Sequence, residues 1–159
     1  MKKMSDKQSI ESKSSDDFFI KINVDQKINK KELFSLISKS VASQKKLSQK
    51  ELFKSLQARE QVKNTSFGNG IAFPHIILDE NVIPNLIICK LAQKIDEWKC
   101  PDNTAVDTCL ILLISRKPQK NSPRIKRLIK IFCKFADKNF ITKISQCQTA
   151  EEIEKHLYL

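Results

Sequence analysis

The sequence of 159 residues contains very little glycine, and its two glycines lie almost side by side. Gly68 and Gly70 flank one asparagine and precede the segment 71–75, Ile-Ala-Phe-Pro-His. Glycine is needed where the backbone takes positive φ or passes close to another group. Because the rest of the chain has none, we expect a tight turn at 68–70 that fixes the position of the segment after it.

Long apolar runs are also missing. No stretch approaches the 18 consecutive apolar residues of a membrane-spanning helix, so no membrane insertion is expected. Residues 1–17 lack the apolar centre of a secretory signal and are rich in serine, lysine and aspartate. With 40% apolar residues overall, we predict one folded domain over 18–159 after a disordered polar leader over 1–17.

The five cysteines show no spacing typical of metal ligands. Their number is odd, no Cys-x-x-Cys occurs, and several lie within apolar runs, where a free thiol behaves as a small hydrophobic side chain. We therefore expect free thiols, no metal site and no bound cofactor. Free thiols indicate a reducing, cytoplasmic location.

Acidic residues are scarce between positions 116 and 143, which contain ten lysines and arginines but only Asp137 as an acid. Much of the net charge of +11 therefore belongs to one segment. Ser122 and Pro123 predict a helix start within it, with the basic residues on a solvated face. Clustered cations can also bind nucleic acid, but the phenylalanines here fall on the apolar face, so nucleic acid is not the expected partner.

Hydrophobic periodicity predicts alternating strands and helices. Helix starts are indicated by Asn29, Ser48, Ser122 and Thr149, and the first, second and fourth of these have a glutamate three residues later. The pattern predicts strands at 18–24, 71–73, 86–91 and 108–114, and helices at 30–43, 49–60, from 123 and from 150. Near-continuous apolar strands separated by helices indicate an α/β fold with helices on both faces of one sheet.

His75 is the main candidate for chemistry. We expect Pro74 to end the strand at 71–73, which leaves His75 at a strand end, where α/β folds often place functional groups. Imidazole can act as a nucleophile, base or ligand near neutral pH. The residues alone nevertheless favour a structural histidine, because no partner His, Cys or Asp pattern accompanies it. His156, near the C-terminus, is interpreted as a surface or packing residue.

The run Ala-Arg-Glu at 58–60, Thr65 and the segment 68–75 resemble the signature of the fructose/mannitol-type enzyme IIA domain of the bacterial phosphotransferase system, nearest its stand-alone nitrogen-regulatory branch. The likeness extends from Phe18 to the C-terminus and includes 136–138 and 149–153. It implies a single-domain mixed β-sheet flanked by helices on both faces. It also implies that His75 accepts a phosphoryl group from a phosphohistidine carrier protein, as a transferase that regulates an unknown target protein.

The same resemblance assigns phosphate stabilisation to Arg59, whose guanidinium offers paired donors to phosphate oxygens. The alternative for Arg59 is an ion pair with a glutamate that caps the helix end. Backbone N–H groups and hydroxyls of the turn are expected to add donors, although the hydroxyls are equally suited to capping the turn. The residues of this phosphate-binding turn are Thr65, Ser66, Gly68, Asn69 and Gly70.

Two departures from the family pattern put phosphotransfer in doubt. Members commonly have a second histidine at the start of the helix after the basic loop, where this chain has Arg124 and Lys126. A cation can contact phosphate but cannot accept a proton as imidazole does. Ile76 stands where a small residue usually follows the histidine, and its branched side chain could restrict a partner's approach. The alternative function is a phosphorylation-independent protein-interaction module.

Overall fold

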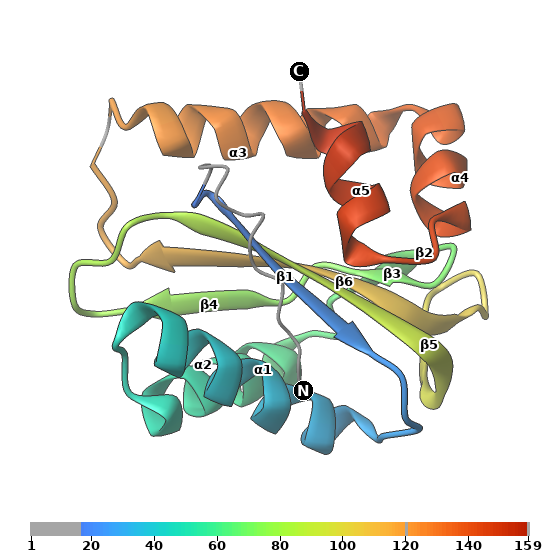
Figure 1. Cartoon of the computed structure of the whole chain (residues 1–159), viewed down its shortest axis with the longest axis horizontal. Helices are drawn as coiled ribbons and strands as arrows, with labels where there is room; N and C mark the ends of the chain where they lie inside the picture. The colour runs from blue at the N-terminus through green and yellow to red at the C-terminus, as the bar shows by residue number, and fades with distance from the viewer. Residues whose placement is uncertain (1–16, 120, 159) are drawn as a thin grey trace.

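The computed structural model describes residues 17–119 and 121–158 and shows a six-stranded mixed sheet between two layers of helices (Figure 1). The strand order is β1-β5-β6-β3-β2, and β4 also pairs with β6. Parallel pairing joins β1 to β5 and both β3 and β4 to β6, whereas β5 and β6 are antiparallel. The predicted mixed sheet with helices on both faces is confirmed. The predicted leader, residues 1–17, lies outside the described residues except for Asp17.

The predicted elements are present in the predicted order with some changes in length, and β2, β4 and α4 are additional. The strands are β1 Phe19–Val24, β2 Ser66–Gly68, β3 Ile71–Ala72, β4 His75–Leu78, β5 Asn85–Lys99 and β6 Ala105–Ser115. The helices are α1 Lys30–Lys45, α2 Gln49–Val62, α3 Pro123–Cys133, α4 Lys138–Gln146 and α5 Ala150–Leu157, with a 3-10 turn at Lys134–Ala136.

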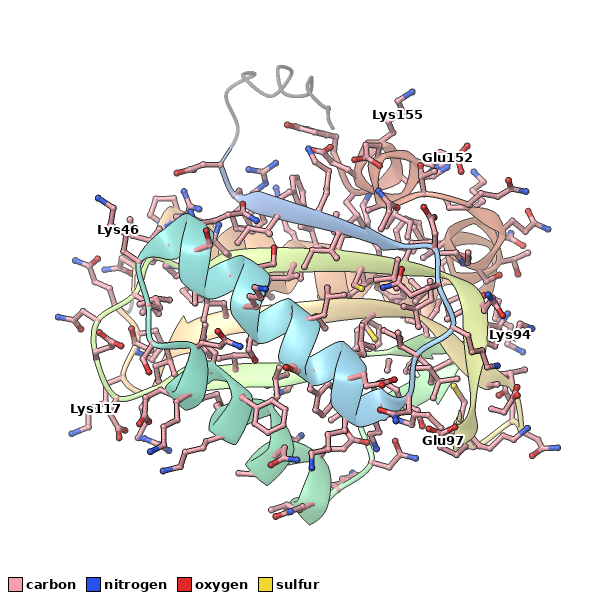
Figure 2. The ribbon with its side chains drawn as sticks, turned by 60° about the horizontal axis from the view of Figure 1, so that its bottom comes forward. Lys46, Lys94, Glu97, Lys117, Glu152 and Lys155 are labelled. Carbon is pink, nitrogen blue, oxygen red and sulfur yellow. The ribbon has the colours of Figure 1, made fainter. Side chains whose placement is uncertain are left out.

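Two hydrophobic clusters lie on opposite faces of the sheet. Helices α1 and α2 cover one face with the fully buried side chains of Leu33, Ile37, Leu52 and Leu56. Helices α3, α4 and α5 cover the other face. Figure 2 shows α1 and α2 crossing the sheet, with Lys46 and Lys117 at one end of the molecule and Lys94 and Glu97 at the other. The core is therefore divided by the sheet.

The helix starts confirm the capping predictions. Asn29 and Glu32 form a reciprocal capping box, and the side chains of Ser48, Ser122 and Thr149 each accept a backbone N–H three residues on. The predicted helix from 123 is shorter than expected because it tightens into a 3-10 turn and a new helix, α4, follows it. Ile129 of α3 is 58% exposed, although its side chain is large and apolar.

Part of the basic segment contacts aromatic rings instead of facing only solvent. The guanidinium of Arg127 lies 4.4 Å from the ring centroid of Phe18 and 4.9 Å from that of Phe19. Lys134 lies 5.2 Å from the ring centroid of Phe140. Such cation–π contacts are stabilising. The predicted solvated basic face is therefore partly a packing surface between α3, β1 and the C-terminal helices.

All five cysteines are free thiols, of which Cys133 is exposed and the other four are buried. Burial raises the pKa of the Cys89 thiol to about 12. Within the described residues, no group of three or more His, Cys, Asp or Glu side chains is arranged to hold a metal ion. Across the same residues, no helix combines the length and apolar character needed to cross a membrane.

Candidate functional site

His75 lies at an interruption in the strand edge beside β6. Strands β3 and β4 pair with β6 one after the other, with Ala72 opposite Cys109 and His75 opposite Leu112. Between them the proline cannot donate a ladder hydrogen bond, but its carbonyl oxygen accepts one from the Leu112 N–H at 3.1 Å. The prediction that the strand ends at Pro74 is confirmed, since β3 stops at Ala72. His75 is not left at a strand end, however, because pairing with β6 resumes there and His75 is the first residue of β4.

A groove of about 400 Å³ runs between α2 and β4, and His75 lines it. Three cationic side chains share the groove with it, namely Lys54, Arg59 and Arg116. Burial, and secondly the positive charge of Arg59, lower the pKa of His75 below its ordinary value of 6.5. The imidazole is therefore mostly neutral at pH 7. A neutral ring has a nitrogen lone pair available for a nucleophilic or acceptor role.

Arg59 reaches this groove from the C-terminal part of α2. It forms no ion pair with any acidic side chain among residues 17–119 and 121–158. Its neighbour Glu60 instead pairs with Lys30 at 2.8 Å and accepts the Thr65 hydroxyl at 2.7 Å. The alternative of an Arg59–Glu cap is not what the structure has, because Glu60 bonds to α1 and to the turn. Arg59 lines the groove with His75, and its charge acts on the ring.

Arg116, the first residue of the basic segment 116–143, also lines the groove, and the sequence did not mark it as a site residue. It follows the last residue of β6, and its N–H donates to the Leu78 carbonyl at the end of β4. Its Nε lies 2.6 Å from Oδ1 of Asp79, which also lines the groove. The available signal in the sequence was that Arg116 directly follows β6 and Asp79 directly follows β4. Only the parallel pairing of β4 with β6 brings the two strand ends together.

The backbone N–H groups of the turn at 68–70 are bonded to side chains of the connection between β5 and β6, one of which is a carboxylate. The Asn69 N–H donates to Oδ2 of Asp102 at 2.9 Å, and the Gly70 N–H donates to the Thr104 hydroxyl at 2.8 Å. Asn69 and Gly70 have φ of 53° and 75°, in the left-handed region that suits asparagine and glycine. The expected tight turn is present, and these two donors hold the β5–β6 connection instead of facing His75.

The hydroxyls of Thr65 and Ser66 are also occupied. Thr65 donates to Glu60, and Ser66 donates to the Lys99 carbonyl at 2.9 Å. Hydroxyls that satisfy nearby acceptors stabilise the approach to the turn. Both hydroxyls therefore cap the turn, as one of the two predictions for them had it, instead of pointing to a phosphate. None of the five residues predicted for a phosphate-binding turn lines the groove of His75.

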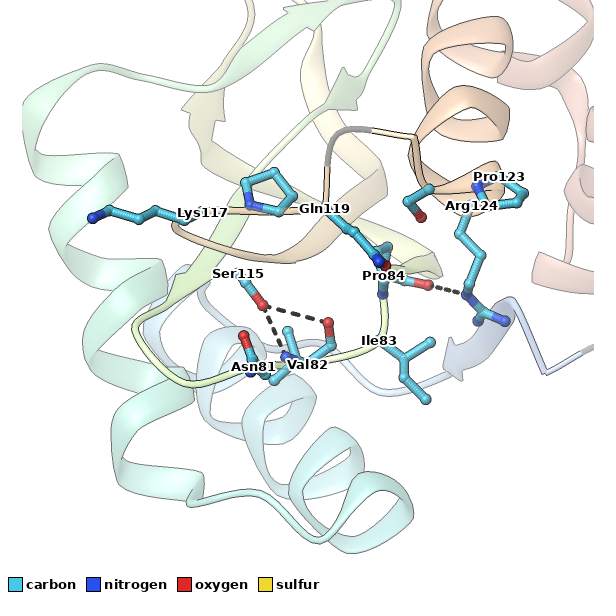
Figure 3. Close-up of a pocket in the computed structure, with 11 residues that line it drawn as sticks. Asn81, Val82, Ile83, Pro84, Ser115, Lys117, Gln119, Pro123 and Arg124 are labelled. Carbon is cyan, nitrogen blue, oxygen red and sulfur yellow. Dashed lines mark hydrogen bonds between the residues drawn. The ribbon is translucent and has the colours of Figure 1, made fainter.

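Arg124 lies in a different part of the molecule from His75. Its Nε donates to the Pro84 carbonyl at 2.7 Å (Figure 3), and its Nη1 pairs with Oδ1 of Asp17 at 3.1 Å. It lines a separate cavity of about 720 Å³ between the β4–β5 connection and the start of α3. Neither Arg124 nor Lys126 lines the groove of His75. The structure therefore does not bring Arg124 to the position of a second histidine beside His75.

Ile76 is completely buried and packs in the core cluster beneath α1 and α2. It alternates with His75 along β4, so it has no exposed surface with which to meet a partner. The expectation that Ile76 restricts a partner's approach is corrected by this burial. Its branched side chain instead suits a buried strand position.

Comparisons with known proteins agree with this fold along almost the whole chain. Residues 19–158 match the family model described as phosphoenolpyruvate-dependent sugar phosphotransferase system, EIIA 2. The nitrogen regulatory protein of Klebsiella oxytoca is 28% identical over 125 residues, which cover 79% of this chain and 76% of that protein. The protein of the same name from Escherichia coli K12 is 27% identical over the same shares.

Solved structures show the same architecture. The nitrogen regulatory protein IIA-Ntr from Neisseria meningitidis superposes with a TM-score of 0.69 at 25% identity, covering 86% of this chain and 92% of that chain. IIA mannitol from Escherichia coli has a TM-score of 0.56 at 14% identity, covering 89% and 96%, and supports the fold alone. Since the family match runs from β1 to α5, the chain belongs to the EIIA 2 family of the phosphoenolpyruvate-dependent sugar phosphotransferase system.

Proposed function

We propose that this protein is a phosphocarrier in which a ring nitrogen of His75 accepts a phosphoryl group from a phosphohistidine carrier protein. The nitrogen lone pair forms the new N–P bond while the donor's N–P bond breaks, and the electron pair of that bond returns to the donor imidazole. The observation that carries the proposal is a half-buried histidine beside an arginine that has no acidic partner among the described residues.

The groove supplies the charge that this reaction needs. Phosphoryl transfer depends mainly on positioning and on electrostatic stabilisation of the transferred group. Arg59 is the cation that acts on His75, and its guanidinium can donate two hydrogen bonds to phosphate oxygens. The lowered pKa keeps His75 neutral at pH 7, so no proton has to leave the ring before attack.

We further propose that the phosphorylated state of His75 regulates the binding of a second protein. The relatives named nitrogen regulatory protein support a regulatory role, and the structure of mannitol IIA with phosphorylated IIB shows another protein of this fold bound to a protein partner. A phosphoryl group adds up to two negative charges to a groove that contains Lys54, Arg59 and Arg116. This local change of charge is suited to altering which partner binds.

The second candidate function is an interaction module that has lost phosphotransfer. It was suggested by Ile76 and by the missing second histidine. Ile76 is buried and does not obstruct the groove. A missing second imidazole leaves the neutral nucleophile and Arg59 in place. The phosphocarrier is therefore the function that the site supports better.

The test is the intact mass of the protein after incubation with a phosphorylated histidine carrier protein. Wild type and His156→Gln should each gain one acid-labile phosphoryl group, because His156 is exposed on α5 away from the groove. His75→Gln should gain none. A folded wild type that gains no phosphoryl group from a competent donor would support the interaction module instead.

A further inference from the structure

The outer edge of β4 is bonded to a helix instead of to another strand. Among residues 17–119 and 121–158, β4 pairs with β6 alone, so no described strand bonds to the peptide groups of its other edge. The Ser55 hydroxyl on α2 makes two hydrogen bonds to the backbone of Ile77 on that edge. It accepts the N–H of Ile77 at 2.9 Å and donates to the C=O of Ile77 at 3.2 Å. One side chain therefore fastens α2 to the strand.

The spacing from Ser55 to Arg59 along α2 is close to the spacing from Ile77 to His75 along β4. Ser55 and Arg59 are four residues apart, so they lie on one face of α2 and are separated by about 6 Å along the helix. Ile77 and His75 are two residues apart, so they project to the same side of β4 and are separated by about 6.6 Å along the strand. All four residues line the same groove. The two spacings match, which places Arg59 beside His75 when Ser55 is bonded to Ile77.

We propose that Ser55 is a positioning residue that holds Arg59 and His75 in register by fixing α2 on the outer edge of β4. The inference rests on the proposed phosphocarrier function of His75. The hydroxyl itself does not stabilise the phosphoryl group, because both of its hydrogen-bonding roles are taken by Ile77. It acts through the guanidinium one helical turn away.

Removal of the Ser55 hydroxyl should disturb the geometry of Arg59 and His75 and slow phosphoryl transfer. Without the hydroxyl, the N–H and C=O of Ile77 lose a partner and α2 loses its bond to the strand. A displacement of about 1 Å in a reacting geometry can lower a rate by as much as 100-fold. We expect Ser55→Ala to reduce phosphoryl transfer to His75 by about tenfold, and Ser55→Thr, which keeps a hydroxyl, to restore most of the rate.

The first experiment measures the pKa of His75 by nuclear magnetic resonance in wild type, Ser55→Ala, Ser55→Thr and Ser38→Ala. Ser38 is a matched control, since its buried hydroxyl donates to the Phe34 carbonyl at 2.8 Å within α1. In Ser55→Ala the His75 pKa should rise toward 6.5, because the ring gains water and loses the nearby charge of Arg59. It should stay low in Ser55→Thr and in Ser38→Ala.

The second experiment is a double-mutant cycle with Arg59→Ala, measured on the transfer rate and on the His75 pKa. If Ser55 acts through Arg59, Ser55→Ala should change the transfer rate far less when the guanidinium is already absent. The His75 pKa should then rise by a smaller amount, because only the part due to hydration of the ring remains. An unchanged His75 pKa in Ser55→Ala, or an equal rise in Ser38→Ala, would overturn the proposal. Fully additive effects would overturn it too.

The pKa readout also separates this proposal from the proposed function. A wild type that takes up no phosphoryl group would refute the phosphocarrier function, whereas the His75 pKa would still decide whether Ser55 sets the Arg59–His75 geometry. Normal uptake together with a low His75 pKa in Ser55→Ala would refute the role of Ser55 and leave the phosphocarrier function standing.

Discussion

At the scale of single residues, the groove favours the neutral form of the His75 imidazole. Burial and the Arg59 charge both disfavour the imidazolium form and lower the His75 pKa. This arrangement suits a nucleophile and is costly for a structural histidine, which would gain more from a hydrogen-bond partner. No described residue forms a hydrogen bond with the His75 ring within the groove. The environment therefore favours reactivity over a purely structural role.

The lowered pKa predicts a pH dependence of stability that belongs to His75. Below about pH 6.5 the imidazole of the unfolded chain takes up a proton before the folded ring does, so protonation favours unfolding. We expect the free energy of unfolding of wild type to fall relative to His75→Gln as the pH drops below 6.5, by at most about 1.4 kcal/mol per pH unit. Denaturant titrations between pH 8 and 5 measure it.

Well above pH 6.5 the difference between wild type and His75→Gln should be constant, because the ring is then neutral in both the folded and the unfolded chain. A difference that grows in favour of wild type as the pH falls would show a raised pKa and contradict the description of the groove.

Which site residues were predictable depended on how local their signal is. His75 and Arg59 lie within one continuous motif, and the structure confirms that they meet in one groove. Arg116 was missed because its place follows from the pairing of β4 with β6, and a sequence pattern does not state which strands pair. Ser55 was missed because its partner is a backbone edge, which has no signature in the sequence.

At the scale of elements, the 68–70 turn stabilises the β5–β6 hairpin through hydrogen bonds. The turn precedes β3, whereas His75 follows it. The N–H groups of the turn bind Asp102 and Thr104, and the N–H groups of Asp107 and Thr108 donate to the Gly70 carbonyl. The sequence predicted that this turn binds phosphate. In the structure the N–H of Asn69 is instead bonded to a carboxylate of the chain itself.

Gly70→Ala should therefore destabilise the fold without removing the chemistry. An added Cβ would lie 3.0 Å from both the Ala105 carbonyl oxygen and Oδ1 of Asp107, at a φ of +75° that favours glycine. We expect a loss of about 2–3 kcal/mol in the free energy of unfolding. Thermal denaturation measures that loss, and phosphoryl uptake should remain at temperatures where the variant is folded.

A phosphate-binding role of the turn makes the opposite prediction for the same variant. In that case Gly70→Ala would lose phosphoryl uptake while still folded. His75→Gln is the matched comparison, because it should lose uptake without the backbone strain. The pair of variants separates a turn that shapes the hairpin from a turn that contacts phosphate.

Most of the elements were predictable, and the misplaced boundaries have two different causes. β5 extends to Lys99 and β6 begins at Ala105. Both limits were missed because the outer half of this hairpin is mostly polar and is followed by the turn-forming residues at 101–103, a composition that resembles a loop. Asp137 caps α4 by accepting the Asn139 N–H at 2.9 Å, and this cap was the available signal for a new helix. The continuous apolar spacing of 125–136 concealed it.

At the scale of the whole molecule, the sheet separates two cores and shields the thiols. Four of the five cysteines are buried, and Cys133 alone among them is exposed. Burial raises the pKa of Cys89 to about 12 and also raises the pKa of Cys109, so both stay protonated and unreactive near neutral pH. The thiols therefore report on the integrity of the fold.

We predict that an aromatic disulfide reagent at pH 8 modifies one thiol in the native protein and all five after unfolding in denaturant. Cys133→Ser should remove the native reaction and leave four thiols in the unfolded chain. Rapid modification of several thiols in the native state would contradict the burial of the two cores. An unfolded count that falls short by two would indicate a disulfide.

The measurement that tests the central claim most directly is the nitrogen spectrum of the histidine rings in wild type, labelled with nitrogen-15, before and after incubation with the phosphorylated carrier protein. We predict that His75 begins as a neutral imidazole at pH 7 and that one of its ring nitrogens acquires the shift of a phosphoramidate, while His156 is unchanged. An unchanged His75 ring after incubation with a competent donor, or phosphorylation of His156 alone, would contradict the account.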